Sequence, residues 1–145
     1  MKAVIFDFNR TLYDPDSKSL VKGAIASLHQ LKKANYLLFL IGKGTSERAD
    51  LINELGLSPY FEEIIVKEEK DLEDFQYLKN KYPQAVFYVF GDRVRKEITF
   101  GNACGFKTIW FKNGKFATET PEAAEEIPWK TVESFEELDI ALNET

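Results

Sequence analysis

Two aspartates of this 145-residue chain come directly after apolar segments, and each is followed by further polar side chains. Asp7 ends the first apolar segment and Asn9 follows it, whereas Asp92 comes after a later apolar segment and precedes Glu97. Paired carboxylates suit a hard divalent cation such as Mg²⁺, which takes one or two carboxylates together with water and substrate phosphate. An aspartate can also be a nucleophile that accepts a phosphoryl group. These residues therefore indicate metal-assisted chemistry on a phosphate.

A second set of residues is suited to binding an anion. Backbone N–H groups at the start of a helix can hold a phosphate, and a nearby lysine can neutralise charge in a transition state. The candidates for the backbone cradle are Gly42, Lys43, Gly44 and Thr45, which follow an apolar segment. The candidate lysines are Lys67 and Lys70.

The pattern of hydrophobic residues predicts the elements that position these groups. Apolar segments predict strands at 2–8, 36–41, 63–66, 85–90 and 108–111. Three-to-four spacing of apolar residues predicts helices across 20–31, 45–55, 72–82, 94–104 and 134–142. This alternation is typical of an α/β fold with a parallel sheet and helices on both faces, in which ligands bind beyond the carboxyl ends of the strands. We expect one domain over residues 1–145, with residues 113–128 as either a flap or a solvated loop.

Composition limits the classes of partner. The net charge is −5, which disfavours nucleic-acid binding but leaves small phosphorylated ligands open. No apolar segment approaches the roughly 20 residues of a membrane helix, and nothing resembles a signal peptide, so we expect a cytoplasmic protein without membrane contact. The single cysteine, Cys104, rules out an intramolecular disulfide.

Each of these residues also has an ordinary structural explanation. An aspartate after a strand is more often a turn residue, and Thr45 or Ser46 can simply cap a helix. The functional interpretation therefore depends on the combination of four strand ends.

Four segments resemble the haloacid dehalogenase (HAD) superfamily, and together they span nearly the whole chain. They are residues 7–14 (DFNRTLYD), 91–98 (GDRVRKEI), 101–105 (GNACG) and 107–110 (KTIW). The resemblance implies a three-layer Rossmann-like core and a hydrolase, most often a phosphatase that uses Mg²⁺ on a small phosphorylated substrate or a phosphorylated macromolecule. It favours this family over a receiver-like or flavodoxin-like domain.

The resemblance also implies roles for individual residues. It makes Asp7 the nucleophile and a magnesium ligand, Lys70 the lysine of the third motif with Lys67 as runner-up, and Asp92 and Glu97 further groups at the metal.

Two positions depart from the family pattern. Asn9 stands where the family has an aspartate that works as general acid and base, although its backbone carbonyl can still bind the metal. Gly42 stands where the family has a serine or threonine that binds the phosphoryl group, and Thr45 is a partial replacement. Acid–base assistance is typically worth about 10²–10⁴-fold in rate. The alternative to a phosphatase is therefore a weak or inactive module that binds a phosphorylated ligand or partner.

Spacing predicts the absence of the cap domain that such proteins often carry. The intervals from Asp7 to Gly42 and from Gly42 to Lys70 have room for one helix and its connections each. An open site of this kind fits a bulky substrate, or closure by a partner such as a second copy of the chain.

Overall fold

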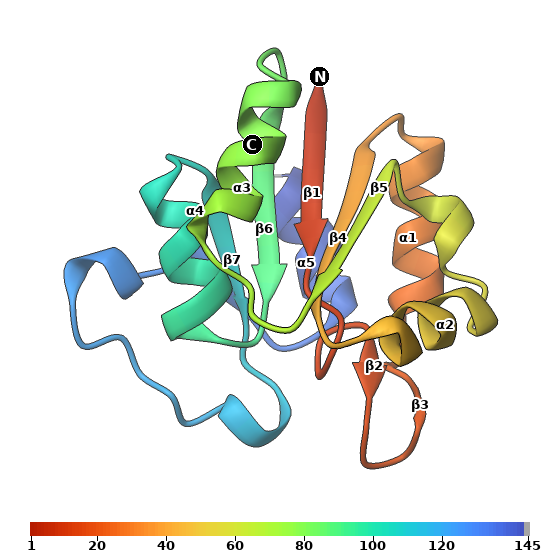
Figure 1. Cartoon of the computed structure of the whole chain (residues 1–145). Helices are drawn as coiled ribbons and strands as arrows, with labels where there is room; N and C mark the ends of the chain where they lie inside the picture. The colour runs from red at the N-terminus through yellow and green to blue at the C-terminus, as the bar shows by residue number, and fades with distance from the viewer. Residues whose placement is uncertain (144–145) are drawn as a thin grey trace.

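The computed structural model describes residues 1–143, and its centre is a parallel sheet with the strand order β5-β4-β1-β6-β7-β8 (Figure 1). The predicted α/β fold with a Rossmann-like sheet is therefore confirmed. The strands are β1 (Lys2–Phe6), β4 (Leu37–Lys43), β5 (Glu63–Lys67), β6 (Val86–Gly91), β7 (Lys107–Phe111) and β8 (Lys130–Val132).

Helices cover both faces of the sheet because the central strand is apolar on both sides. Val4 and Phe6 of β1 belong to a core shared with α1 (Ala24–Lys33), α2 (Ser46–Glu54) and α5 (Phe135–Asn143). Ala3 and Ile5, which point to the opposite face, belong to a core shared with α3 (Leu72–Lys81) and α4 (Thr99–Ala103). Successive side chains of a strand alternate between faces, so one strand supports both layers.

Some elements differ from the predicted ones. The helix predicted from residue 20 begins at Ala24, because Leu20 lies in a short hairpin of β2 (Tyr13–Asp14) and β3 (Ser19–Leu20). Ile25 follows the three-to-four spacing of apolar residues in 20–31, yet it is exposed. Strand β8 was not predicted, and its three residues are too few to show a period.

The helix predicted across 94–104 has two parts. Residues Val94–Ile98 form a widened π turn, in which the Ile98 N–H reaches the Arg93 carbonyl at 3.4 Å, and α4 follows directly. Gly101 lets α4 approach the sheet, since a Cβ there would lie 2.6 Å from the Thr108 side chain. The glycine is thus explained by close packing.

The carboxyl ends of the strands meet at one edge, near the start of α2 and the β2–β3 hairpin (Figure 1). β1 lies between β4 and β6, where the order of connections reverses, and such a switch point is the usual ligand site of an open α/β sheet. The interval between β1 and β4 holds only the hairpin and α1. The interval between β4 and Lys70 holds α2, a single 3₁₀ turn (Ser58–Tyr60) and β5, so neither interval contains an inserted domain.

Among residues 1–143, no helix has both the length and the apolar character needed to cross a membrane.

Candidate functional site

A buried lysine lies at the centre of the switch point. The Lys70 Nζ donates a hydrogen bond to Asp7 Oδ1 at 2.7 Å and another to Glu97 Oε1. Burial alone would lower the pKa of Lys70, but the negative charges of Asp7 and Glu97 outweigh it and hold the pKa above its usual range. The ammonium therefore stays charged. Lys67 instead pairs with Asp71 and Asp74, away from Asp7.

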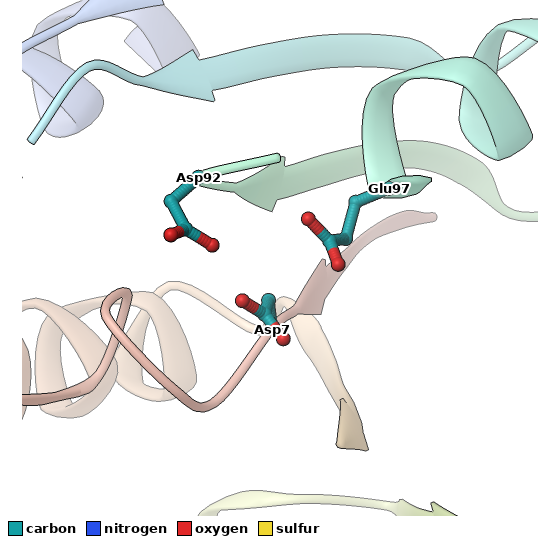
Figure 2. A group of neighbouring side chains, drawn as sticks. All are labelled: Asp7, Asp92 and Glu97. Atoms are coloured by element: carbon teal, nitrogen blue, oxygen red, sulfur yellow. The ribbon is translucent and has the colours of Figure 1, made fainter. Parts of the chain in front are cut away.

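Three buried carboxylates lie close together at the switch point: Asp7 from the end of β1, Asp92 from the end of β6, and Glu97 from the π turn (Figure 2). One oxygen of each lies within 4.8 Å of the others. Burial and the charge of Asp7 raise the pKa of Asp92 to about 9, and the same two causes raise the pKa of Glu97. Three ionised carboxylates would carry more negative charge than Lys70 alone can balance, which is the electrostatic setting of a cation site.

The hydrogen bonds divide these oxygens into two groups. Both oxygens of Glu97 have donors, because Oε2 accepts from the Arg93 N–H at 3.1 Å. Asp92 Oδ2 and Asn9 Oδ1 are buried and have no hydrogen-bond partner among residues 1–143. Buried acceptors without a donor are unusual and costly, and oxygen atoms are the ligands that Mg²⁺ prefers. The donor set at this point therefore fits a magnesium ion.

Local backbone geometry explains why Glu97 reaches the cluster. The π turn widens the helix just after Asp92, so that Glu97 points back toward β6. Gly91 leaves the space that the side chain needs, since a Cβ at that position would lie 2.8 Å from Glu97 Oε2. The indole Nε1 of Trp110 donates to the Asp92 carbonyl at 3.0 Å and fixes this backbone. Trp110 is buried, and it also orients the site.

A cavity of about 360 Å³ opens above the carboxylates. Of the four residues predicted to bind phosphate, Lys43 and Gly44 line it, whereas Gly42 and Thr45 do not. Thr45 occupies the N-cap position of α2 without a capping hydrogen bond from its side chain. The other lining residues outside the carboxylate cluster are Asn9, Arg10, Arg48, Glu69, Lys70, Arg93, Lys96 and Phe116.

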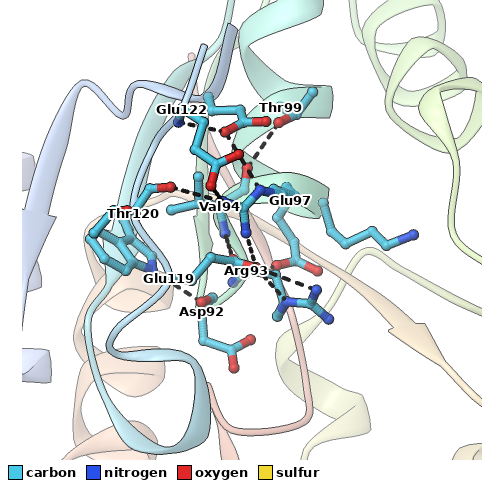
Figure 3. A network of polar contacts seen from close by, with 12 residues as sticks. Asp92, Arg93, Val94, Glu97, Thr99, Glu119, Thr120 and Glu122 are labelled. Carbon is cyan, nitrogen blue, oxygen red and sulfur yellow. Dashed lines mark hydrogen bonds and ion pairs between the residues drawn. The ribbon is translucent and has the colours of Figure 1, made fainter. Parts of the chain in front are cut away.

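Residues 112–128, which we call the strap, form one wall of this cavity through Phe116. The guanidinium of Arg93 lies 3.9 Å from the centre of the Phe116 ring. Glu119, in the same segment, accepts the Val94 N–H at 2.6 Å and pairs with Arg93 and Arg95 (Figure 3). The sequence analysis allowed either a flap or a solvated loop over residues 113–128. The contacts show that this segment is attached to the site.

The far end of the strap is also anchored. The Asn102 side chain donates to the carbonyls of Glu125 and Ile127 at 2.9 Å each, and it accepts from Thr108 at 2.7 Å. This explains why an asparagine stands in the 101–105 segment.

Sequence reasoning did not assign roles to three residues near the site. Thr11 is fully buried and donates to Asp7 Oδ2 at 3.2 Å, so each Asp7 oxygen has one donor. The two others, Phe116 and Glu119, come from a segment without periodicity. Only Thr11 carried a signal in the sequence, namely its position soon after Asp7.

Comparison with known proteins agrees with this arrangement. No protein-family model matches the chain. A glyceraldehyde 3-phosphate phosphatase of Pyrococcus furiosus is 31% identical over 111 residues, which are 67% of this chain and 44% of the relative. The chain thus spans less than half the length of that relative.

Two solved structures have the same fold. A Bacillus subtilis HAD-hydrolase, YfnB, solved bound to magnesium, gives a TM-score of 0.72 at 25% identity, over 86% of this chain and 57% of that one. The D,D-heptose 1,7-bisphosphate phosphatase of B. bronchiseptica gives a TM-score of 0.75 at 14% identity, with the whole of both chains covered. Fold, relatives and the buried acidic cluster agree, and the chain belongs to the haloacid dehalogenase superfamily.

Proposed function

We propose that the chain is a magnesium-dependent phosphatase that transfers the phosphoryl group of a small phosphomonoester to Asp7. The observation that carries the proposal is the position of Asp7, hydrogen-bonded to Lys70 beside Asp92 at the base of a cavity with basic walls. Two relatives support it, since one is named a glyceraldehyde 3-phosphate phosphatase and another is a phosphatase solved with magnesium and phosphate.

The proposed magnesium ligands are Asp7, Asp92 and the backbone carbonyl of Asn9. Among residues 1–143, Asp92 Oδ2 has no hydrogen-bond partner, whereas both oxygens of Asp7 and both oxygens of Glu97 already accept hydrogen bonds. Glu97 reaches the metal directly or through water in this proposal, and it also orients Lys70. Bound magnesium supplies positive charge to the transferring phosphoryl group.

In the proposed reaction, a carboxylate oxygen of Asp7 forms a bond to phosphorus while the bond from phosphorus to the substrate oxygen breaks. Lys70 stays protonated and offsets the charge on Asp7 and on the phosphoryl oxygens. Lys43 and Gly44 line the same cavity, although the Gly44 N–H donates to the Lys67 carbonyl at 2.9 Å. Water then hydrolyses the aspartyl phosphate, which releases phosphate and restores the carboxylate.

Asn9 affects the proton that the departing substrate oxygen must gain. An amide cannot supply this proton as a carboxylic acid does, so it comes from water or from another donor. Substrates whose leaving group is already a weak base need no such help. We therefore expect higher turnover with aryl phosphates than with alkyl phosphates.

The test is hydrolysis of p-nitrophenyl phosphate with and without Mg²⁺. We expect turnover by the wild-type chain that disappears in Asp7→Asn and on addition of EDTA. Asp50→Asn is the matched control, because Asp50 is exposed on α2 and lies outside the cavity. Equal activity of Asp7→Asn and wild type would exclude Asp7 as the nucleophile.

A second candidate function is binding of a phosphorylated ligand without turnover, and Asn9 is the observation that favours it. In that case the wild-type chain binds phosphate in the presence of Mg²⁺ but hydrolyses no ester. Calorimetric titration with inorganic phosphate, beside the hydrolysis assay, separates the two functions.

A further inference from the structure

The mouth of the cavity contains an acidic side chain held between two lysines. Glu69 Oε1 lies 3.2 Å from the Lys96 Nζ, and Glu69 Oε2 lies 3.6 Å from the Lys43 Nζ. All three residues line the cavity, and they come from three separate segments: the end of β4, the loop before α3, and the π turn. One carboxylate therefore bridges two ammonium groups across the opening.

This geometry shows that the two lysines are spaced to hold one carboxylate. Each carboxylate oxygen faces a different ammonium, so an anionic group of similar size on a ligand could take the same place. The backbone of Lys43 belongs to the predicted phosphate cradle, whereas its side chain is directed to Glu69. The lysine clamp, meaning Lys43 and Lys96, is thus separate from the groups that face the reacting phosphoryl.

Glu69 is held only weakly between Lys43 and Lys96. The side chains of Glu69 and Lys43 are 62% and 64% exposed, and exposed ion pairs contribute little to stability because water and salt compete with them. The opening is basic although the chain has a net charge of −5, since Arg10, Arg48 and Arg93 also line the cavity. A ligand with a second negative charge would therefore displace Glu69 at small cost.

We propose that Lys43 and Lys96 bind a second anionic group of the phosphorylated substrate, and that Glu69 occupies this clamp until the substrate enters. The inference rests on the proposed function and specifies its substrate class. The substrate is a small phosphomonoester that also carries a carboxylate or a second phosphate.

The experiment compares substrates that differ only in this group. Phosphate esters of unbranched hydroxy acids with two to four carbons are compared with the alkyl phosphates of the same length, and alkanediol bisphosphates form a third arm. The readout is the ratio of kcat/KM for the charged ester to that for the alkyl ester. We expect this ratio to be well above one in the wild-type chain, and the third arm shows whether a carboxylate or a phosphate is preferred.

Variants of the two lysines and of Glu69 should change this kcat/KM ratio in opposite directions. Lys43→Gln and Lys96→Gln should each lower the ratio by about two- to five-fold, since an exposed pair of charged groups is lost. Glu69→Gln should raise it, mainly through a lower KM for the charged ester, because the competing carboxylate is gone. Lys33→Gln is the control of equal charge, on the exposed end of α1 and outside the cavity. A ratio near one in the wild-type chain, or a lower ratio in Glu69→Gln, would overturn the clamp.

Binding measurements separate this inference from the proposed function. Phosphonates are not hydrolysed at the carbon–phosphorus bond, so 3-phosphonopropanoate and propylphosphonate can be compared by calorimetry in the presence of Mg²⁺. Tighter binding of 3-phosphonopropanoate without turnover of any ester would support the clamp and exclude the phosphatase. Turnover with equal binding of the two phosphonates would support the phosphatase and exclude the clamp.

Discussion

The Lys70 ammonium links Asp7 to Glu97, two carboxylates from opposite halves of the chain. Lys70 lies 63 residues from Asp7 and 27 residues from Glu97 in sequence, and all three side chains are buried. Loss of one partner from a buried ion pair leaves uncompensated charge, which makes this link a strong determinant of stability.

Lys70→Met should therefore destabilise the fold. We expect the free energy of unfolding to fall by about 3–5 kcal/mol without metal, because the carboxylates lose their counter-charge. Addition of Mg²⁺ should recover part of this loss. Urea unfolding with EDTA and with Mg²⁺ measures both effects. Lys67→Met, which removes a half-buried lysine that pairs with Asp71 and Asp74, should have a much smaller effect. Equal losses in the two variants would contradict the central role of Lys70.

Asp92→Asn should stabilise the metal-free protein at neutral pH. Burial and the charge of Asp7 raise the pKa of Asp92 to about 9 in the folded state, so between about pH 4 and pH 9 the folded chain binds more protons than the unfolded chain. The Asp92 contribution to stability therefore falls as pH rises through this window. Asparagine removes that dependence, and the advantage of the variant should shrink toward pH 4.

The same substitution should remove the stabilisation that Mg²⁺ gives to the wild-type chain, since a proposed ligand is lost. Melting temperatures from pH 4 to pH 9, with EDTA and with Mg²⁺, test both parts. Asp50→Asn provides the matched surface control. A wild-type melting temperature without Mg²⁺ that rises steadily from pH 5 to pH 9 would argue against the raised pKa of Asp92.

Asn9→Asp should raise turnover of alkyl phosphates more than turnover of aryl phosphates. The new carboxyl group lines the cavity and can give a proton to the leaving oxygen, and such assistance is typically worth about 10²–10⁴-fold. A kcat profile against pH should acquire a limb that the wild-type chain lacks. If both substrate classes gain equally, the new carboxylate acts on the metal and not on the proton.

Gly42→Ser should be tolerated and should tighten phosphate binding. A Cβ at Gly42 would lie 3.6 Å from the Phe8 Cβ, which is an ordinary contact, and no other atom lies within 4 Å. We expect the free energy of unfolding to stay within about 1 kcal/mol of wild type, since glycine is itself unfavourable in a strand. Calorimetry with inorganic phosphate and Mg²⁺ measures the binding.

Gly44→Ser is the contrasting variant, because φ is 155° there and a Cβ would lie 2.6 Å from the Arg48 Cβ. Unchanged phosphate binding in Gly42→Ser would mean that residue 42 lies too far from the phosphate.

Glu119→Ala should release the strap from the π turn. Glu119 accepts the Val94 N–H and pairs with two arginines, so its loss should lower the free energy of unfolding by about 1–3 kcal/mol. Amide hydrogen exchange should accelerate at Val94 and within residues 112–128. Glu122→Ala is the control, since Glu122 pairs with Arg95 at the surface with 74% of its side chain exposed. Similar exchange rates in the two variants would show that Glu119 does not anchor the strap.

The sequence by itself determined the layers of this fold and the strand ends that carry the chemistry. Periodicity is a local property: an apolar strand must be covered on both faces, and the carboxyl ends of parallel strands meet at one edge. The positions of Asp7 and Asp92, and of Lys67 and Lys70 as two candidate lysines, were therefore predictable from apolar segments and the polar residues beside them.

Only the tertiary structure decided which of these groups contact one another. It brings Lys70, and not Lys67, into contact with Asp7. It also turns Glu97 back to the carboxylates through a π turn, and it attaches the strap through Glu119. No local period encodes such contacts, because they form only when packed layers bring the segments together. The same packing places Glu69 between Lys43 and Lys96. Taken singly in the sequence, each of these three residues indicates only an ordinary surface charge.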